Sequence, residues 1–260
     1  MSPTLTVANW KMNGNRRFWS DLTQSLKSEM QDIETNVVLC APSAAFYDVS
    51  RALEGVTNMA LAAQDIHAED SGAHTGDTSA EMAKDFGAKF TLVGHSERRL
   101  EHFEKGNVLK AKFKQALNHD LHPILCFGES LDDKKNDQTL KVLDGQLSEV
   151  LDGVEVLDGD AFSLAYEPVW AISSSAGSLG REPSEDELTQ VFEFVRQKMV
   201  EKFGEEVGNN IKLLYGGSVK ADNVAKIISN RYIAGVLVGG ASLKAESFLA
   251  IARAVAAKPN

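Results

Sequence analysis

Short apolar runs alternate with longer amphipathic stretches along this chain. Eight such runs are present: Leu5–Ala8, Val37–Cys40, Met59–Ala63, Phe90–Val93, Pro123–Phe127, Phe162–Ala165, Ile211–Tyr215 and Gly235–Val238. Continuous apolar runs are typical of parallel strands that are buried on both faces. Helical patterns, such as Val108–Leu117 and Glu185–Phe203, lie between the runs. The pattern therefore predicts strands that alternate with helices, as in a series of βα units.

Strands that alternate with helices indicate a parallel sheet with right-handed crossovers. Eight βα units in 260 residues fit a closed (β/α)8 barrel, with residues 1–260 forming a single domain. An open, doubly wound sheet is the alternative. No G-x-G-x-x-G follows the first run, which weighs against a dinucleotide-binding sheet. In a barrel, the active-site groups stand at the C-terminal ends of the strands or in the loops that follow them.

Composition and charge narrow the classes of function. Hydrophobic residues make up 43% of the chain and charged residues 25%, which is ordinary for a globular protein. No apolar run approaches the roughly 18 residues that span a bilayer, so we expect no membrane protein. The net charge of −10, without a basic run, argues against nucleic-acid binding. A small anionic substrate remains compatible, because a local site can be positive inside a negative envelope.

The cysteines and the N-terminal segment indicate the cellular compartment of the protein. Cys40 and Cys126 are the only cysteines, and both lie in apolar runs. They are predicted to be buried thiols in a reducing compartment, too far apart in sequence to indicate a zinc site. The segment MSPTLTVANWKMNG lacks the features of a secretory signal. We therefore expect a cytoplasmic protein.

The first predicted strand leads into Asn9-Trp10-Lys11-Met12-Asn13-Gly14. Asn9 and Lys11 are two residues apart, so they share a face if the strand extends that far. A lysine that points into a barrel mouth is costly without an anion, so Lys11 is a candidate for binding one. A solvated loop lysine is the alternative interpretation.

The fourth predicted strand leads into Gly94-His95-Ser96-Glu97-Arg98-Arg99. His95 is expected where a short helix begins, and the helix dipole there disfavours the imidazolium form. A neutral imidazole can donate a hydrogen bond to a carbonyl oxygen and polarise it. The alternative is a structural histidine beside ion pairs of Glu97 and the arginines. We favour the ion-pair interpretation for Arg98 and Arg99.

The sixth predicted strand leads into Tyr166-Glu167-Pro168-Val169-Trp170-Ala171. A glutamate at the end of an apolar strand, beside aromatic side chains, is desolvated, which suits a general base near neutral pH. A carboxylate paired with an arginine is the alternative. The stretch Pro168–Ser184 shows no periodicity, and an unstructured loop of that length in a compact domain is typically a lid.

Glycine pairs follow the last two predicted strands, in Tyr215-Gly216-Gly217-Ser218 and in Val238-Gly239-Gly240. Glycine lets backbone N–H groups approach a ligand closely. The loops after strands 7 and 8 of such barrels often form a phosphate site. A single Gly-Gly pair could be a simple turn, but two pairs in these two loops favour a phosphate cradle.

Together, these groups indicate proton transfer next to a carbonyl on a small phosphorylated substrate. A carboxylate, a neutral hydrogen-bond donor, a lysine and a phosphate cradle are the parts that such a reaction needs. No metal-ligand spacing accompanies them, so we expect neither a metal nor a cofactor.

Five of these segments resemble the motifs of the triosephosphate isomerase family, and its bacterial members most. The segments are NWKMNG, GHSERR, YEPVWAI, LLYGGSVK and LVGGASLK, in the family's order and at the family's strand ends. The resemblance implies a TIM barrel and a cytoplasmic homodimer that acts in glycolysis and gluconeogenesis without a cofactor. It implies interconversion of dihydroxyacetone phosphate and D-glyceraldehyde 3-phosphate through an enediolate by proton transfer.

The resemblance also assigns catalytic roles. Glu167 resembles the family's base, which moves a proton between two substrate carbons. His95 resembles the electrophile. Asn9 and Lys11 resemble the groups that bind substrate and stabilise the enediolate charge, and Glu97 resembles the carboxylate behind Lys11.

Further roles in binding and assembly follow from the same resemblance. Ser218, Gly239 and Gly240 resemble phosphate ligands, and Ser173 stands near the place of the lid amide that also binds phosphate. The Asp65–Thr78 loop resembles the family's interface loop, in which Thr75 completes the site of a partner subunit.

Two departures from the family pattern are visible. The family continues Ala171-Ile172 with Gly-Thr-Gly-Lys, whereas this chain carries the longer run 173–183 before a capping box that begins at Ser184. The catalytic loop is thus predicted to be about five residues longer than usual, when aligned from that capping box. His74 replaces a residue that is usually aromatic.

Two other functions remain as alternatives. The first is a non-catalytic phosphate-binding barrel whose altered lid does not close, and the second is another phosphosugar enzyme built on a barrel. The joint presence of Lys11, His95 and Glu167 weighs against the second.

Overall fold

The computed structural model describes residues 4–30, 32–172 and 181–258 and contains a closed parallel barrel. In the described part, neighbouring strands pair in sequence order, and β8 closes the barrel by pairing with β1. The predicted (β/α)8 barrel is confirmed, and the open sheet is wrong. The strands are β1 (Leu5–Asn9), β2 (Asn36–Ala41), β3 (Met59–Ala63), β4 (Ala88–Val93), β5 (His122–Phe127), β6 (Ser163–Tyr166), β7 (Lys212–Tyr215) and β8 (Gly235–Val238).

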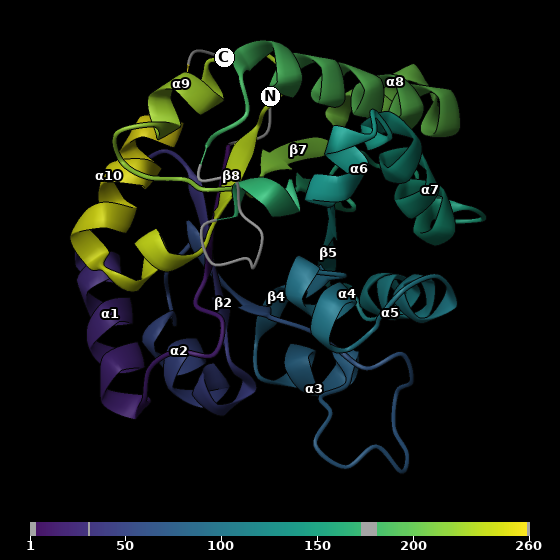
Figure 1. Cartoon of the computed structure of the whole chain (residues 1–260). Coiled ribbons are helices and arrows are strands. Elements are labelled where there is room, and N and C mark those ends of the chain that lie inside the picture. The colour runs from purple at the N-terminus through teal and green to yellow at the C-terminus, as the bar shows by residue number, and fades with distance from the viewer. Residues whose placement is uncertain (1–3, 31, 173–180, 259–260) are drawn as a thin grey trace.

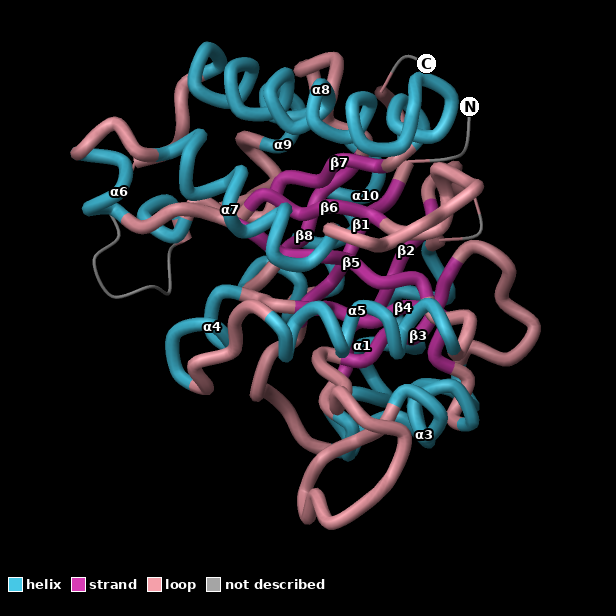
Figure 2. The backbone as a smooth tube through the Cα atoms, turned by 90° about the vertical axis from the view of Figure 1, so that its right-hand side faces the viewer, coloured by secondary structure: helices cyan, strands magenta, loops and turns pink. Residues whose placement is uncertain are grey.

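Helices surround the strands, as Figures 1 and 2 show from two directions. The α-helices are α1 (Arg16–Glu29), α2 (Phe46–Ala52), α3 (Ala80–Asp85), α4 (Ser96–Glu101), α5 (Asn107–Asn118), α6 (Leu131–Lys135), α7 (Thr139–Leu151), α8 (Glu185–Asn210), α9 (Val224–Ile228) and α10 (Ala245–Ala256). Short 3-10 turns are η1 (Ser43–Ala45), η2 (Val169–Ala171) and η3 (Gly240–Leu243).

The core has two layers, which explains why the strands read as continuous apolar runs. Side chains such as Val7, Cys40 and Cys126 pack with each other inside the barrel. The alternate side chains, such as Leu39 and Leu125, face outward and pack against the helices. Every second residue of a strand points to the opposite face, so a strand covered on both sides needs apolar residues throughout. Both cysteines are free and buried, as predicted.

Local signals in the sequence set the bounds of α8. Ser184 forms a capping box with Glu187: its side chain accepts from the Glu187 amide at 3.2 Å, and its amide donates to the Glu187 carboxylate at 2.8 Å. The helix is interrupted at Gly204, where φ is +82°. The predicted helix Glu185–Phe203 therefore matches the first of two helical segments.

Barrel closure depends on a close approach between two strands. A Cβ atom built on Gly235 would lie 1.9 Å from the carbonyl oxygen of Leu5, so no side chain fits there. Leu5 and Gly235 are partners in the β1–β8 register. Glycine at this position lets the last strand reach the first.

No helix in the three described ranges is long and apolar enough to span a membrane. The loop between β3 and α3 projects from the barrel, at the lower right of Figure 1. Residues 69–73 and 75–77 of this loop are exposed.

His122 provides a test of the packing at the start of β5. Its Nε2 lies 2.7 Å from Ser163 Oγ, and burial, followed by the charge of Lys212, lowers its pKa to about 4. The unfolded value is about 6.5, so the unfolded chain binds the extra proton between these values. The stability that neutral His122 contributes is therefore present above pH 6.5 and is lost as the pH falls toward 4.

We predict that His122 alone lowers the free energy of unfolding by about 2 kcal/mol between pH 7 and pH 5. Urea unfolding at fixed protein concentration should show a shallower pH dependence for His122→Gln than for the unmodified chain. The exposed His102→Gln variant is the control and should keep the original dependence. Parallel pH profiles for all three proteins would contradict the prediction.

Candidate active site

A pocket of about 350 Å³ opens at the C-terminal ends of the strands. Its walls come from the segments that follow β1, β4, β6, β7 and β8. Seven of the residues that the sequence singled out line it: Asn9, Lys11, His95, Glu167, Ser218, Gly239 and Gly240. Because the C-terminal ends of the strands converge on one side of the barrel, residues that are far apart in the chain meet in this pocket.

Lys11 is held at the pocket wall by its backbone and by Glu97. Its φ of +49° lies in the left-handed region, which few residues other than glycine adopt. Its amide donates to Asn9 Oδ1 at 3.0 Å, and its carbonyl accepts from Gln64 Nε2 at 2.9 Å. Its Nζ lies 2.7 Å from Glu97 Oε1, and its side chain is 19% exposed. Lys11 is thus not a solvated loop residue.

His95 precedes α4 and caps it with its own ring. Nδ1 accepts a hydrogen bond from the Glu97 amide at 3.2 Å. An acceptor nitrogen carries no proton, so this hydrogen bond assigns the proton of a neutral ring to Nε2. Nε2 lies 3.3 Å from Glu167 Oε1. The pocket is thereby supplied with an imidazole N–H that can donate to a ligand.

Glu167 follows β6 directly and is only 2% exposed. Its Oε2 accepts a hydrogen bond from the Ser96 amide at 3.1 Å. Gly216 lies against its side chain, and a Cβ built there would be 2.7 Å from Glu167 Cγ. Any larger residue at position 216 would therefore displace the carboxylate.

A buried thiol and a partly buried guanidinium interact with this carboxylate. Burial, and next the Glu167 carboxylate, raises the pKa of the Cys126 thiol well above its usual value. The thiol stays protonated, so it does not act as a nucleophile. Arg99 donates to the carbonyl oxygens of Gly94 at 2.8 Å and Cys126 at 3.0 Å, and burial lowers its pKa. Arg99 therefore ties the end of β4 to the end of β5.

The arginine after His95 that forms ion pairs is Arg98. It pairs with Glu104 and lies 3.0 Å from Asp65. The ion-pair interpretation holds for Arg98, whereas Arg99 donates its hydrogen bonds to main-chain oxygens. Glu97 pairs with Lys11 instead of an arginine.

Glu129 is a buried residue of this region that our sequence analysis missed. Its carboxylate accepts from Trp170 Nε1 at 2.8 Å and from the Tyr166 hydroxyl at 3.1 Å. Burial, and next the charge of Glu129, raises the pKa of Tyr166, so the hydroxyl stays protonated and donates. These bonds fix the segments on both sides of Glu167. Glu129 comes just after β5, so its position at a strand end is the sequence feature from which it could have been predicted.

The loops after β7 and β8 form the part of the pocket wall between Glu167 and Lys11. A Cβ built on Gly239 would lie 3.6 Å from Lys11 Cε, which shows how closely this loop approaches the lysine. The Ser218 amide donates to the Ala171 carbonyl at 3.1 Å, which joins the β7 loop to the segment after Glu167. Lys220, which the sequence analysis also missed, lines the same wall. Two lysines and glycine backbone are a suitable environment for an anion.

Three of the predicted residues are not among those that line this pocket. Glu97 does not line it but pairs with Lys11, which does. Ser173 lies outside the described residues. Thr75 is exposed on the β3–α3 loop and does not line the pocket.

Comparison with known proteins agrees with this geometry. The family model "Triosephosphate isomerase" matches residues 4–255. The chain belongs to the triosephosphate isomerase family. The predicted family, and with it an isomerase, is confirmed, whereas the lengthened catalytic loop lies largely outside the described residues.

Individual family members are similar over nearly their whole length. The triosephosphate isomerase of Alkaliphilus oremlandii is 41% identical over 251 residues, which cover 96% of this chain and 99% of that protein. The enzyme of Xanthobacter flavus is 40% identical, covering 96% and 97%. A crystal structure of triosephosphate isomerase from Bartonella henselae superposes with a TM-score of 0.85 at 35% identity, covering 98% of this chain and 99% of that one.

We predict that Gly216→Ala lowers kcat by about 10²-fold, because a misplacement of around 1 Å in a reacting group has that effect. The added methyl would press on Glu167 Cγ. The control is Gly145→Ala in α7, where an added Cβ meets nothing within 4 Å. That variant should keep its activity and gain about 0.5–1 kcal/mol in stability. Equal kcat values for the two variants, measured in an isomerase assay, would refute this account of Gly216.

Proposed function

We propose that this chain interconverts dihydroxyacetone phosphate and D-glyceraldehyde 3-phosphate, with Glu167 moving a proton between adjacent carbons. The observation that carries this proposal is the meeting of Glu167, His95 and Lys11 in one pocket. Removal of a proton next to a carbonyl leaves an enediolate, and hydrogen-bond donors with a cation stabilise its negative oxygen. The proton returns to the same molecule, so the reaction needs no redox cofactor, and Lys11 and His95 supply the stabilisation of the negative oxygen.

Glu167 is held aside in the structure by the Ser96 amide. To reach a substrate carbon, the carboxylate has to exchange this hydrogen bond for contact with the substrate. The side chain is almost completely buried, so little solvent competes with a bound substrate for contact with the carboxylate.

Glu97 orients both stabilising groups in this proposal. Its amide donates to His95 Nδ1 and so places the imidazole proton on Nε2, where a carbonyl oxygen can accept it. Its carboxylate pairs with Lys11 Nζ. Glu97 is therefore assigned a positioning role, while Lys11 and Asn9 bind the substrate oxygens beside His95.

The phosphate would lie at Ser218, Gly239 and Gly240, which line the same pocket as Glu167. Lys220 supplies further positive charge at this wall. The sequence adds Ser173 as a lid residue whose amide binds phosphate, within a catalytic loop that is longer than the family's. Because the donor would be a main-chain N–H, serine in place of glycine does not delete it.

We also infer that residues 1–260 act as one domain in a cytoplasmic homodimer. The β3–α3 loop with Thr75 is exposed in the single chain. Apolar side chains of other loops are exposed as well, among them Met12 at 96% and Phe103 at 80%. We assign these two side chains to the contact surface of the proposed dimer.

Glu167→Asp tests the base. The shorter side chain withdraws the carboxylate by about one carbon–carbon bond, and we expect kcat to fall by about 10²-fold. The same change at the exposed Glu155 should have no effect. Both are measured in a coupled isomerase assay, with Glu167→Ala as the background. If the unmodified chain does not exceed that background, the protein is a non-catalytic phosphate-binding barrel instead.

Thr75→Glu tests the assembly. A new charge buried at the contact should raise the dimer dissociation constant by at least about tenfold, or 1.4 kcal/mol. Light scattering with a dilution series is the measurement, and Thr57→Glu, at an exposed position outside the loop, is the control. A stable and fully active monomer of the unmodified chain at micromolar concentration would overturn the proposal.

A further inference from the structure

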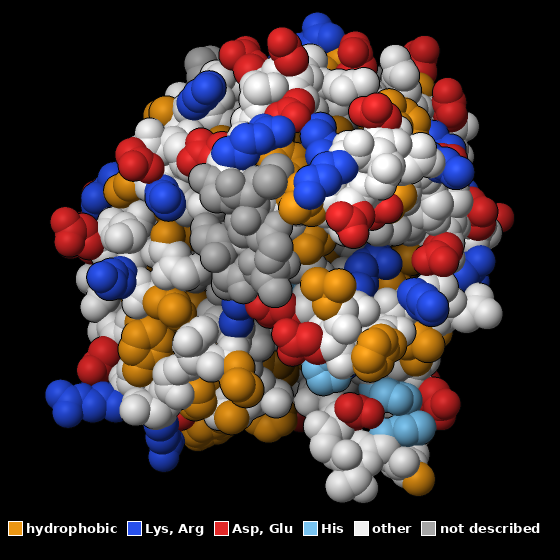
Figure 3. All heavy atoms as spheres, in the orientation of Figure 1, with side chains coloured by type: hydrophobic (Ala, Val, Ile, Leu, Met, Phe, Trp, Pro, Cys, Tyr) orange, Lys and Arg blue, Asp and Glu red, His pale blue; other side chains and the backbone are white. Residues whose placement is uncertain are grey.

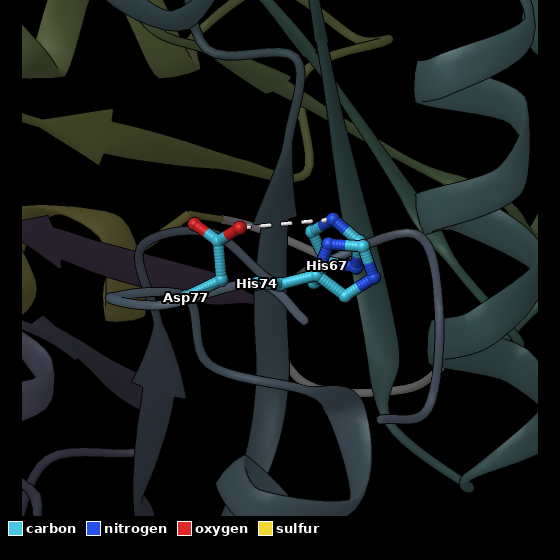
Figure 4. A group of neighbouring side chains, drawn as sticks. All are labelled: His67, His74 and Asp77. Carbon is cyan, nitrogen blue, oxygen red and sulfur yellow. Dashed lines mark ion pairs between the residues drawn. The ribbon is translucent and has the colours of Figure 1, made fainter. Parts of the chain in front are cut away.

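Three potential metal ligands converge on the β3–α3 loop, outside the pocket described above. They are His67, His74 and Asp77, and their donor atoms all lie within 4.8 Å of one another. Figure 4 shows the three side chains turned toward one another across the loop. Within the described ranges, this is the one group of three such side chains with that spacing. We propose that the loop binds a divalent transition-metal ion of the zinc type through these three residues.

The donor spacing is close to that of a zinc site. Ligand bonds of 2.0–2.2 Å at tetrahedral angles place donors roughly 3.3–3.6 Å apart. His67 Nε2 and Asp77 Oδ2 are already 3.6 Å apart. The Asp77 side chain is 52% exposed, so it can rotate to close the remaining distance. Two imidazoles and one carboxylate leave the fourth position for water.

The ring of His74 is oriented by a second carboxylate. Its Nε2 lies 3.2 Å from Glu69 Oε2, which leaves Nδ1 as the nitrogen for an ion. Ligating histidines usually place their other nitrogen against a carboxylate, which fixes the ring and makes the ligand more basic. Glu69 therefore has the position of an outer-sphere partner.

The ring of His67 is stacked on that of His74, with centroids 3.8 Å apart. Its Nδ1 accepts from the Glu69 amide at 3.1 Å, so the neutral ring carries its proton on Nε2. An ion bound at Nε2 takes the place of that proton, and the proton moves through solvent to Nδ1. No net proton is released from a neutral ring, and one hydrogen bond to the Glu69 amide is given up.

The loop backbone holds the ligands in place without the ion. The His67 amide donates to the Thr78 carbonyl at 2.8 Å, and the Asp77 amide donates to the His74 carbonyl at 3.1 Å. Gly72, at φ +144°, lies so close to the ring of His74 that a Cβ there would be 3.2 Å from Nε2. Because the backbone of the site is already ordered, binding of an ion costs less conformational entropy.

The surroundings also favour a cation. Figure 3 shows histidine side chains gathered on this part of the surface with acidic side chains beside them. Residues 67–77 of the loop include three carboxylates, those of Glu69, Asp70 and Asp77. The whole chain has a net charge of −10. Thr75 lies between two of the ligands in sequence, so a bound ion would restrain the residue that we assign to the dimer contact.

Zinc binding to the EDTA-treated protein tests this proposal, measured by equilibrium dialysis against ZnCl2 at pH 7.5. We expect one ion per chain. His74→Phe should lower the affinity by at least about 100-fold, and Glu69→Gln by about tenfold, since outer-sphere changes typically cost 10–100-fold. Phenylalanine is suited to position 74 because the family motif usually carries an aromatic residue there. If that variant does not fold, Asp77→Asn at an exposed position tests the same site.

The matched control is His119→Gln. His119 Nε2 lies 2.6 Å from Asp70 Oδ1, which makes it another exposed histidine–carboxylate pair near the same loop. Its loss should leave zinc affinity unchanged. Equal zinc affinity in the unmodified chain and in the His74 and Asp77 variants, or no binding by the unmodified chain, would overturn the proposal. Isomerase activity is not the readout, so a failed site would leave the proposed reaction standing.

Discussion

Closure of the barrel between its first and last strands is the constraint on which the site depends. Leu5 and Gly235 approach so closely that only glycine fits at position 235. This contact carries the end of β8 to the end of β1, and so places Gly239 beside Lys11. Without closure, the lysine and the proposed phosphate loop would lie on opposite edges of an open sheet. The relative positions of the loops that form the pocket are thus set by closure of the sheet.

Within that frame, a few polar residues orient one another. Glu97 joins two strand ends, because its amide fixes the ring of His95 and its carboxylate holds Lys11. Glu129 does the same for the segments around Glu167, through the hydroxyl of Tyr166 and the indole of Trp170. Glu129 is fully buried, and a buried polar group is costly unless it is paired, so its pairing also limits where its partners can lie.

The β3–α3 loop, which carries the proposed metal site, depends less on barrel closure than the pocket does. The shape of its tip depends on its own main-chain bonds and on Gly72, while Ile66 anchors the start of the loop in the core. The tip of the loop can therefore vary without moving the pocket of its own chain. His74, which departs from the family's aromatic residue, is such a variation, and here it faces a second histidine at stacking distance.

The sequence by itself determined the eight strands, because a strand buried on both faces must be apolar throughout, and β3 and β8 have the predicted bounds. It also indicated His95 and Glu167, since strand ends of a barrel converge whatever the loops contain. Only the tertiary structure decided the pairing of Glu97 with Lys11, the role of Glu129 and the meeting of His67 with Asp77. These contacts depend on side-chain directions and loop conformations, which have no periodic pattern in the chain from which they could be predicted.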